Sequence, residues 1–304
     1  KMREVTAMTL ASVAVACVRG LSMEHLAPAR TFFVTGATDG IGRHTARRLA
    51  SDGHRLLVHG RSQEKGPALV QDLLERGAYS VDYFNGDMSD LEDVSRLADQ
   101  VLAASDRIDV LINNAGVYDP PQRKSAQGFD TTWAVNVLAP FVLTRRLLPL
   151  LASGDQPRII TTSSISQSSR FDADNLNQEK GYSAHSAYSI SKLGDRMFTV
   201  GLAHRLASAS SPSLRRIRCV TMDPGTVNTK MLLAGWGACG IPVSAADNTY
   251  TLATQDVALE GKNGRYFFGG AGSPDAENLE LVDVLWSKLE EQAGCSYQDV
   301  STAI

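Results

Sequence analysis

Tyr188 and Lys192 lie four residues apart, at the start of a segment with helical patterning. Residues at this spacing share one face of a helix. A phenol with its usual pKa of about 10 is a poor base at neutral pH, but a neighbouring ammonium favours the phenolate and lowers that pKa. Tyr188 could therefore exchange a proton with a substrate oxygen. The same spacing also arises by chance in ordinary surface pairs, so its weight depends on what accompanies it.

Other polar groups stand where such a site would need them. Ser163 and Ser164 directly follow the strand predicted at 158–162, and a hydroxyl there could hydrogen-bond a reacting carbonyl. Asn136 lies within a helical pattern, although asparagine is a poor helix former. Its amide could contribute to such a site, or it could form a hydrogen bond with its own backbone. Both interpretations stay open. Residues 113–116, Asn-Asn-Ala-Gly, directly follow the strand predicted at 108–112.

A glycine-rich turn, Thr-Gly-Ala-Thr-Asp-Gly-Ile-Gly at residues 35–42, joins a strand-like run to a helical pattern. Gly36, Gly40 and Gly42 allow a tight turn and a close approach of backbone to a pyrophosphate. The following helix offers unpaired N–H groups and the positive end of its dipole to phosphates. In this context the turn predicts a dinucleotide site.

The end of the second strand bears on the choice of dinucleotide. An acidic residue there usually binds the ribose 2′-hydroxyl of NAD, whereas this chain has Gly60, Arg61 and Ser62. A guanidinium can pair with a 2′-phosphate. Arg61 therefore favours NADP(H) over NAD(H), unless its side chain only points to solvent.

These groups need a scaffold, and the hydropathy pattern predicts strands alternating with helices. The expected strands are 31–35, 55–59, 80–84, 108–112, 158–162, 218–222 and 266–268. The expected helices include 69–74, 91–104, 126–151 with a bend at Pro140, 186–206 and 276–292, besides one that begins near Ile41. Continuous apolar strands are typical of a parallel sheet covered on both faces. We expect an α/β fold in which residues 31–304 form a single domain after an N-terminal extension, residues 1–30.

Composition limits the function classes. The chain has 304 residues, 43% hydrophobic, and a net charge of -3, which does not fit a nucleic-acid-binding protein. Its cysteines form no Cys-x-x-Cys pair and lie near no histidine cluster, so we expect neither a metal site nor a disulfide framework, and a reducing intracellular compartment. They are Cys17, Cys219, Cys239 and Cys295.

The N-terminal segment has two interpretations. Residues 5–18 are weakly polar at most and flanked by basic residues, but they are too short to span a bilayer. They could belong to a targeting remnant within residues 1–20, which would place the protein in an organelle. They could also form a terminal helix packed on the domain. Residues 1–30 are the segment that we expect to engage a membrane or a protein complex, if either is bound.

Taken together, residues 32 to about 268 resemble the short-chain dehydrogenase/reductase family. The motifs occur in the family's order: the glycine-rich turn, Asp87, Asn-Asn-Ala-Gly, Asn136, the two serines, Tyr188 with Lys192, and residues 224–229, which begin Pro-Gly and end in Thr229. The resemblance implies a Rossmann-type doubly wound, mostly parallel sheet of seven strands with helices on both faces. It also implies an oxidoreductase that moves a hydride to or from a carbonyl or alcohol.

The resemblance also implies roles for individual residues. Tyr188 would be the acid/base, and Lys192 would lower its pKa and hold the nicotinamide ribose. Asn136 would hold a water in a proton relay from Lys192. Ser164 aligns best with the catalytic serine, and Ser163 is the alternative.

Cofactor contacts follow in the same way. Asp87 would meet the adenine, Asn114 to Gly116 would line the adenosine side, and Thr229 would bind the carboxamide. Asp39 stands where the family usually has a small or amide residue. The full set of expected cofactor-binding residues is Gly36, Thr38, Asp39, Gly40, Ile41, Gly42, Arg61, Asp87, Met88, Asn114, Ala115, Gly116, Tyr188, Lys192, Pro224, Gly225, Val227 and Thr229.

Within the family the chain is most similar to the retinol-dehydrogenase-like branch, in residues 128–141, 164–188 and 264–268. Residues 231–248 follow Thr229, where the family folds a lid over the substrate, and they are rich in apolar side chains. This favours a small lipophilic carbonyl or alcohol, such as a retinoid, a steroid or a long-chain aldehyde, unless these side chains pack on the core or on a partner subunit of a homo-oligomer. The main hypothesis is an NADP(H)-dependent oxidoreductase. The alternative is a dinucleotide-binding structural or regulatory subunit of a larger assembly.

Overall fold

The computed structural model describes residues 29–256, 259 and 261–297. Its centre is one sheet of seven strands in the order β3-β2-β1-β4-β5-β6-β7, and each neighbouring pair is parallel. The strands are β1 (Thr31–Val34), β2 (Arg55–Gly60), β3 (Ser80–Asn85), β4 (Val110–Asn113), β5 (Arg158–Thr162), β6 (Arg218–Met222) and β7 (Tyr266–Phe267). The order reverses between β1 and β4, which is the crevice where open α/β sheets bind ligands.

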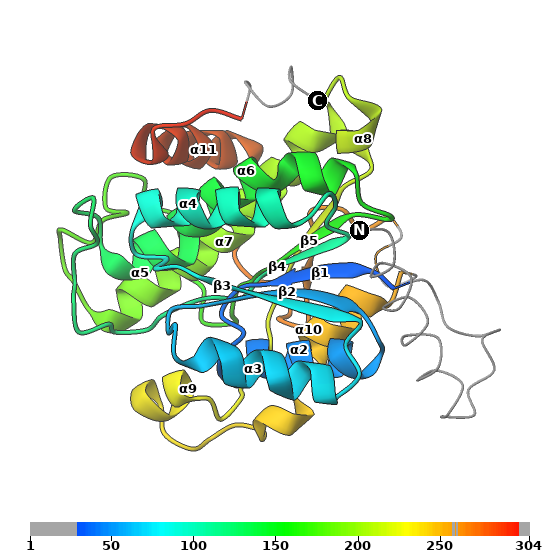
Figure 1. The fold of residues 1–304 in the computed structure, drawn as a ribbon. Coiled ribbons are helices and arrows are strands. Elements are labelled where there is room, and N and C mark those ends of the chain that lie inside the picture. The colour runs from blue at the N-terminus through cyan, green and yellow to red at the C-terminus, as the bar shows by residue number, and fades with distance from the viewer. Residues whose placement is uncertain (1–28, 257–258, 260, 298–304) are drawn as a thin grey trace, which may run out of the picture.

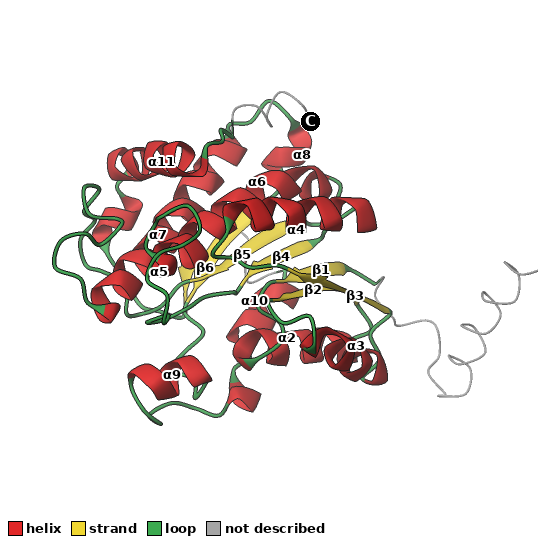
Figure 2. Ribbon diagram, turned by 60° about the vertical axis from the view of Figure 1, so that its left-hand side comes forward, coloured by secondary structure: helices red, strands yellow, loops and turns green. Residues whose placement is uncertain are grey.

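Helices cover both faces of the sheet (Figures 1 and 2). One layer holds α4 (Leu91–Ala104), α6 (Ala139–Ala152), α7 (Ala184–Ala207) and α11 (Leu279–Ala293). The other holds α2 (Gly40–Ser51), α3 (Lys65–Glu75) and α10 (Asn248–Thr254). Shorter helices are α5 (Thr131–Trp133), α8 (Pro212–Arg215), α9 (Lys230–Gly235), the 3-10 turns Val243–Ala245 and Pro274–Glu277, and a π-helical turn, Ala134–Leu138.

The two helical layers enclose two apolar cores, one on each face of the sheet. Phe33 and Leu57 belong to the core under α4, α6 and α7, whereas Phe32, Val34 and Leu56 belong to the core under α2 and α3. Successive side chains of a strand point to opposite faces, so a strand covered on both sides is largely apolar. This confirms the predicted doubly wound, Rossmann-type α/β fold.

Helix α7 positions the Tyr–Lys pair. It begins at a capping box, in which the Ser183 hydroxyl accepts a hydrogen bond from Ser186 N at 2.9 Å and the Ser186 hydroxyl accepts from Ser183 N at 3.0 Å. Such a cap satisfies two otherwise unpaired N–H groups and sets where the helix starts. Tyr188 and Lys192 therefore lie in its first turns, and both are buried against the sheet.

Two predicted helices begin later in the structure than the sequence predicts. The helix expected over 126–151 begins only at Thr131, because Gly128 adopts a φ of +84° and the Asp130 carboxylate caps Trp133 N at 3.1 Å. Its irregularity is the π-helical turn that ends just before α6, and Pro140 sits in the first turn of α6. The last helix begins at Leu279, since the Asn278 side chain caps it, and not at Ala276. Most of the N-terminal extension, residues 1–28, lies outside the described residues.

Candidate active site at the carboxyl edge of the sheet

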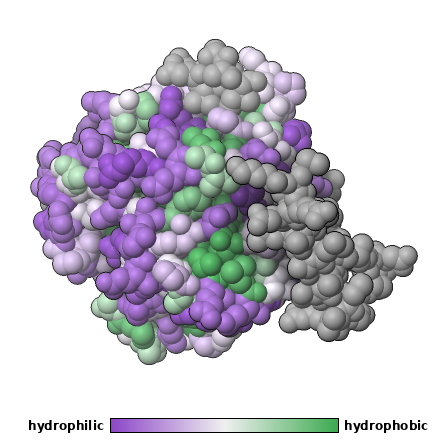
Figure 3. Space-filling model, viewed as in Figure 1, coloured by the Kyte–Doolittle hydropathy of each residue, from purple (hydrophilic) through white to green (hydrophobic). Residues whose placement is uncertain are grey.

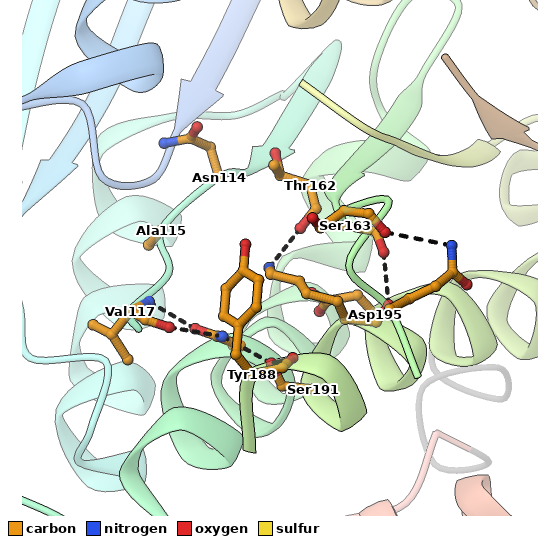
Figure 4. Close-up of polar contacts among 12 residues, drawn as sticks. Asn114, Ala115, Val117, Thr162, Ser163, Tyr188, Ser191 and Asp195 are labelled. Atoms are coloured by element: carbon orange, nitrogen blue, oxygen red, sulfur yellow. Dashed lines mark hydrogen bonds and ion pairs between the residues drawn. The ribbon is translucent and has the colours of Figure 1, made fainter. Parts of the chain in front are cut away.

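Tyr188 projects from α7 toward the carboxyl ends of β4 and β5. In Figure 4 its ring stands between Ala115 and Val117 on one side and Ser163 and Asp195 on the other. Lys192, one helical turn later, donates hydrogen bonds from Nζ to Thr162 O and to Asp195 Oδ2, both at 2.8 Å. The structure thus brings the predicted pair together at the end of β5.

The two candidate serines face different partners. The Ser163 hydroxyl donates to the backbone oxygen of Lys192 at 2.6 Å, so it ties β5 to α7. The Ser164 hydroxyl accepts from Ser166 N at 3.1 Å and lies close enough to the Tyr188 phenol to lower its pKa. Of the two, Ser164 is therefore the one whose hydroxyl lies where Tyr188 and a substrate oxygen could both reach it.

Asn136 sits in the π-helical turn and does not bond its own helix. Its Oδ1 accepts from Val117 N at 2.8 Å, and its Nδ2 donates to Val117 O at 3.1 Å and to the Ser191 hydroxyl at 2.9 Å. Gly116 lies against it, since a Cβ at Gly116 would come 3.3 Å from Asn136 Oδ1 and 3.8 Å from Lys192 Nζ. The amide thus clamps the loop after β4 to the helix that carries Tyr188.

The glycine-rich turn forms a cradle that side chains would fill. A Cβ at Gly42 would lie 2.4 Å from Gly36 O, and Gly36 and Gly40 adopt φ values of +67° and +53°. Such backbone is strained for other residues. A phosphate can therefore approach the main chain and the N-terminus of α2 closely, which is the fit that a dinucleotide requires.

Residues 114–116 are held against this turn. The Thr35 hydroxyl accepts from Asn114 N at 2.9 Å and from Ala115 N at 3.0 Å, and Asn114 Nδ2 donates to Thr35 O at 2.8 Å. The ends of β1 and β4 therefore form one continuous wall from the glycine-rich turn to Tyr188.

Asp39 acts in the structure as the N-cap of α2. One carboxylate oxygen accepts from Gly40 N at 2.9 Å, and the other pairs with Lys230 Nζ at 2.5 Å. Hydrogen bonding to Lys230 is the main reason that the pKa of Asp39 is lowered. Thr229 caps α9 and its methyl group would lie 3.3 Å from a Cβ at Gly40, so residues 229–230 sit beside the glycine-rich turn.

The other predicted cofactor positions lie along the same edge. Arg61 follows β2 and is exposed, and its backbone oxygen accepts from Asn85 Nδ2 at 2.8 Å. Asp87 is exposed beyond β3, whereas Met88 is buried. Thr38 Cγ2 would lie 2.3 Å from a Cβ at Gly60, which places the turn next to the end of β2.

Comparison with known proteins decides the family. The sequence profile for short chain dehydrogenase matches residues 30–235. The chain belongs to the short-chain dehydrogenase family. It is 31% identical to human polyprenol dehydrogenase over 88% of this chain and 86% of that protein. It is 33% identical to mouse retinol dehydrogenase 14 over 87% and 86%, respectively.

Structural comparison agrees. A short-chain dehydrogenase from Escherichia coli, solved in complex with NADPH, superposes with a TM-score of 0.63 at 27% identity, and the match covers 80% of this chain and 97% of that one. The protein is thus an oxidoreductase of the retinol-dehydrogenase-like branch of the family, and the family binds a nicotinamide dinucleotide.

Three buried polar residues of this dehydrogenase were not anticipated from its sequence. His59 lies beneath the glycine-rich turn: its Nδ1 accepts from Gly36 N at 3.3 Å and its Nε2 donates to Gly86 O at 3.0 Å. Burial lowers the pKa of His59, so it holds the turn as a neutral ring. Asp223, after β6, accepts from Ile165 N and Gly225 N, both at 2.5 Å. It therefore joins the loop after β5, which carries Ser164, to Pro224–Gly225.

Asp195 is the third. It lies seven residues after Tyr188 and three after Lys192, a spacing that puts all three on one face of α7. That spacing is a signal that sequence analysis could have used.

Trp236 of the lid segment, residues 231–248, forms an aromatic cluster with Tyr118, His185 and Tyr188. The Trp236 ring lies 4.4 Å from that of Tyr118, 5.9 Å from that of Tyr188 and 6.4 Å from that of His185, centroid to centroid. Trp236 directly follows α9, which has no buried residue, so the apolar side chains of α9 do not pack into the core. Leu233 and Ile241 remain 49% and 45% exposed, and Figure 3 shows apolar surface over α9.

Proposed function

We propose that this short-chain dehydrogenase is an NADP(H)-dependent oxidoreductase acting on a lipophilic carbonyl or alcohol, with Tyr188 as acid/base. The observation that carries the proposal is the position of the Tyr188 phenol. It is buried, lies near the Ser164 hydroxyl and the Lys192 ammonium, and points toward the loop that holds Asn114 and Ala115 (Figure 4).

The cofactor would lie along the wall from the glycine-rich turn to Tyr188. The glycine-rich turn and α2 would hold the pyrophosphate, Arg61 the 2′-phosphate, and residues 114–116 the adenosine side. When bound, the nicotinamide supplies the hydride acceptor or donor. The remaining N–H of Lys192 Nζ is available for a ribose hydroxyl, because its other two are used by Thr162 and Asp195.

The proton chemistry follows from the surroundings of Tyr188. Burial raises the pKa of its phenol, and the Lys192 charge and the nearby Ser164 hydroxyl oppose that rise. The phenol is therefore protonated at neutral pH and can donate its proton to a carbonyl oxygen during reduction. Oxidation of an alcohol needs the phenolate, so its rate should rise with pH as Tyr188 loses its proton.

The roles of the other two groups follow from their contacts. Ser164 can donate a hydrogen bond to the same substrate oxygen, which stabilises the charge that develops there. Asn136 holds the loop after β4 against helix α7. The second lone pair of its Oδ1 could accept a hydrogen bond from a water between Asn136 and Lys192.

A lipophilic substrate is supported by the lid. The rings of Trp236 and Tyr118 form an apolar surface beside Tyr188. Two relatives are named for the alcohols retinol and polyprenol. A screen of aldehydes and ketones of increasing chain length, with NADPH oxidation as the readout, tests this. Equal kcat/KM for short and long chains would contradict it.

Replacing Trp236 by Ala should remove much of this apolar surface. We expect the KM for a long-chain aldehyde to rise about tenfold, since burying such aromatic surface contributes about 1–2 kcal/mol. The KM for a short-chain aldehyde should change little. Steady-state kinetics measure both, with Leu279→Ala, an exposed apolar residue on α11, as the control. Parallel changes for both chain lengths would show that Trp236 does not select lipophilic substrates.

A further inference from the structure

Asp195 is buried behind the Tyr–Lys pair, and neither the proposed proton transfer nor the cofactor contacts use it. Its side chain is 1% exposed and that of Lys192 is 6% exposed. One carboxylate oxygen accepts from Lys192 Nζ at 2.8 Å. The other, Oδ1, is buried without a hydrogen-bond partner among the described residues. A buried carboxylate left half satisfied is costly, so it calls for an explanation.

Lys192 is held from two sides. Thr162 O at the end of β5 and Asp195 Oδ2 on α7 each accept from its Nζ at 2.8 Å. A lysine side chain has four rotatable bonds, and two such contacts select one position for its ammonium. That position lies 5.6 Å from the centre of the Tyr188 ring.

The charge of Asp195 also reaches the phenol. An anion beside the ammonium offsets the positive charge that would stabilise a phenolate, and it raises the pKa of Tyr188 directly. Burial raises the pKa of Asp195 itself to about 7, against the lowering effect of Lys192. The other charged or titratable groups around the pair are Asp223 after β6, Tyr266 in β7, and Arg196, which pairs with Glu277.

We propose that Asp195 is a positioning residue of this site: it holds the Lys192 ammonium beside Tyr188, and its negative charge sets the pH at which Tyr188 exchanges its proton. This rests on the proposed function, in which Tyr188 is the acid/base. Asp195 itself touches neither the phenol nor, in the proposed arrangement, the substrate.

The sign of the effect is the same whichever group gives up the proton first. Tyr188 and Lys192 are close enough to titrate together. Removing a neighbouring negative charge makes the first proton easier to lose from the pair, because its fully protonated form then carries an uncompensated positive charge. The first apparent pKa of the pair therefore falls in Asp195→Asn, by about one unit for a charge at this range.

The test is Asp195→Asn, which keeps the shape of the side chain and an oxygen that can accept from Lys192. In alcohol oxidation the acid limb of the kcat/KM profile should move about one unit toward lower pH, so that the rate on that limb is about tenfold higher than wild type. In the cofactor-free protein, tyrosine carbon NMR should show the same fall in the titration midpoint of Tyr188, whose signal is identified by its absence in Tyr188→Phe.

Asp283→Asn is the matched control. It breaks an ion pair with Arg205, which is also on α7 but remote from Tyr188, and it should move neither readout. If Asp195→Asn fails to fold, Asp195→Ser removes the same charge from a smaller side chain and carries the same expectation.

The outcomes separate the two proposals. A purely structural Asp195 would lower thermal stability or kcat at every pH and leave the limb and the NMR midpoint unchanged, and that result would overturn the inference. If Tyr188→Phe stays active, the proposed function fails. If Tyr188→Phe is inactive but the acid limb of the kcat/KM profile of Asp195→Asn lies at the same pH as in wild type, only the proposed role of Asp195 is contradicted.

Discussion

Tyr188→Phe should lower kcat for carbonyl reduction about 10³-fold, because general acid catalysis by a positioned group contributes roughly 10²–10⁴-fold. The variant keeps the ring that packs against Tyr118 and Trp236 and removes only the phenolic oxygen. NADPH affinity should stay near that of wild type, because in the proposed site the phenol acts on the substrate and the phosphates bind elsewhere. Stopped-flow hydride transfer and a fluorescence titration of NADPH measure the two quantities separately.

Tyr182→Phe is the control for loss of a phenol close by. Tyr182 precedes α7 and its ring lies 3.3 Å from the Arg123 guanidinium, away from Lys192. A Tyr188→Phe enzyme that retains a tenth of wild-type activity would assign the proton transfer to another group. A wild-type protein that binds NADPH tightly and reduces none of a broad carbonyl panel would favour the alternative hypothesis, a dinucleotide-binding regulatory subunit.

The parts of this site that could be predicted are those that local sequence determines. Largely apolar runs covered on both faces become parallel strands. Gly36 and Gly40 are required by their positive φ, and Gly42 by its close contact with Gly36 O within the turn. The Tyr–Lys spacing is likewise local, since a helix puts both on one face. Strand bounds such as 158–162 and 218–222 therefore agree with the structure to the residue.

The rest depends on partners that are distant in sequence. Asn136 is recognisable as a poor helix former, but its role as a clamp comes from Val117 and Ser191, which belong to other elements. His59 looks like one more strand residue until Gly36 and Gly86 are placed against it. Trp236 was expected in a lid, yet only the fold of residues 230–247 brings its ring over Tyr188. Tertiary contacts, not propensities, decide these functions.

In the proposed site the choice between NADP(H) and NAD(H) depends on Arg61, so we expect Arg61→Ala to weaken NADPH binding about 10–100-fold. Hydrogen bonds to a charged partner contribute about 1.5–3 kcal/mol, and each 1.4 kcal/mol is about a factor of ten in Kd. The affinity for NADH should stay within about twofold of wild type, since NADH has no 2′-phosphate to lose a contact. Titrations of both cofactors against wild type and variant measure the ratio of the two Kd values.

The surroundings of Arg61 make this a specific expectation. The turn that carries it is held by the Tyr83 hydroxyl, which bonds Gly60 O at 2.9 Å and Ser62 O at 2.6 Å, and by Asn85, so truncating an exposed side chain should leave the backbone in place. Arg76→Ala, which removes an exposed arginine at the other end of α3, is the matched control and should change neither Kd.

Charge reversal extends the same argument. Arg61→Asp places a carboxylate where it can accept hydrogen bonds from a ribose 2′-hydroxyl and repel a 2′-phosphate, so it should invert the preference toward NADH. The NADPH affinity of wild type should also fall as salt is added, because the proposed contact with the exposed Arg61 would be screened. If Arg61→Ala weakens the binding of NADPH and NADH equally, the arginine supports the turn and does not bind the 2′-phosphate. The preference for NADPH must then come from another cation at this edge of the sheet. Lys65, at the start of α3, is the first such cation to test.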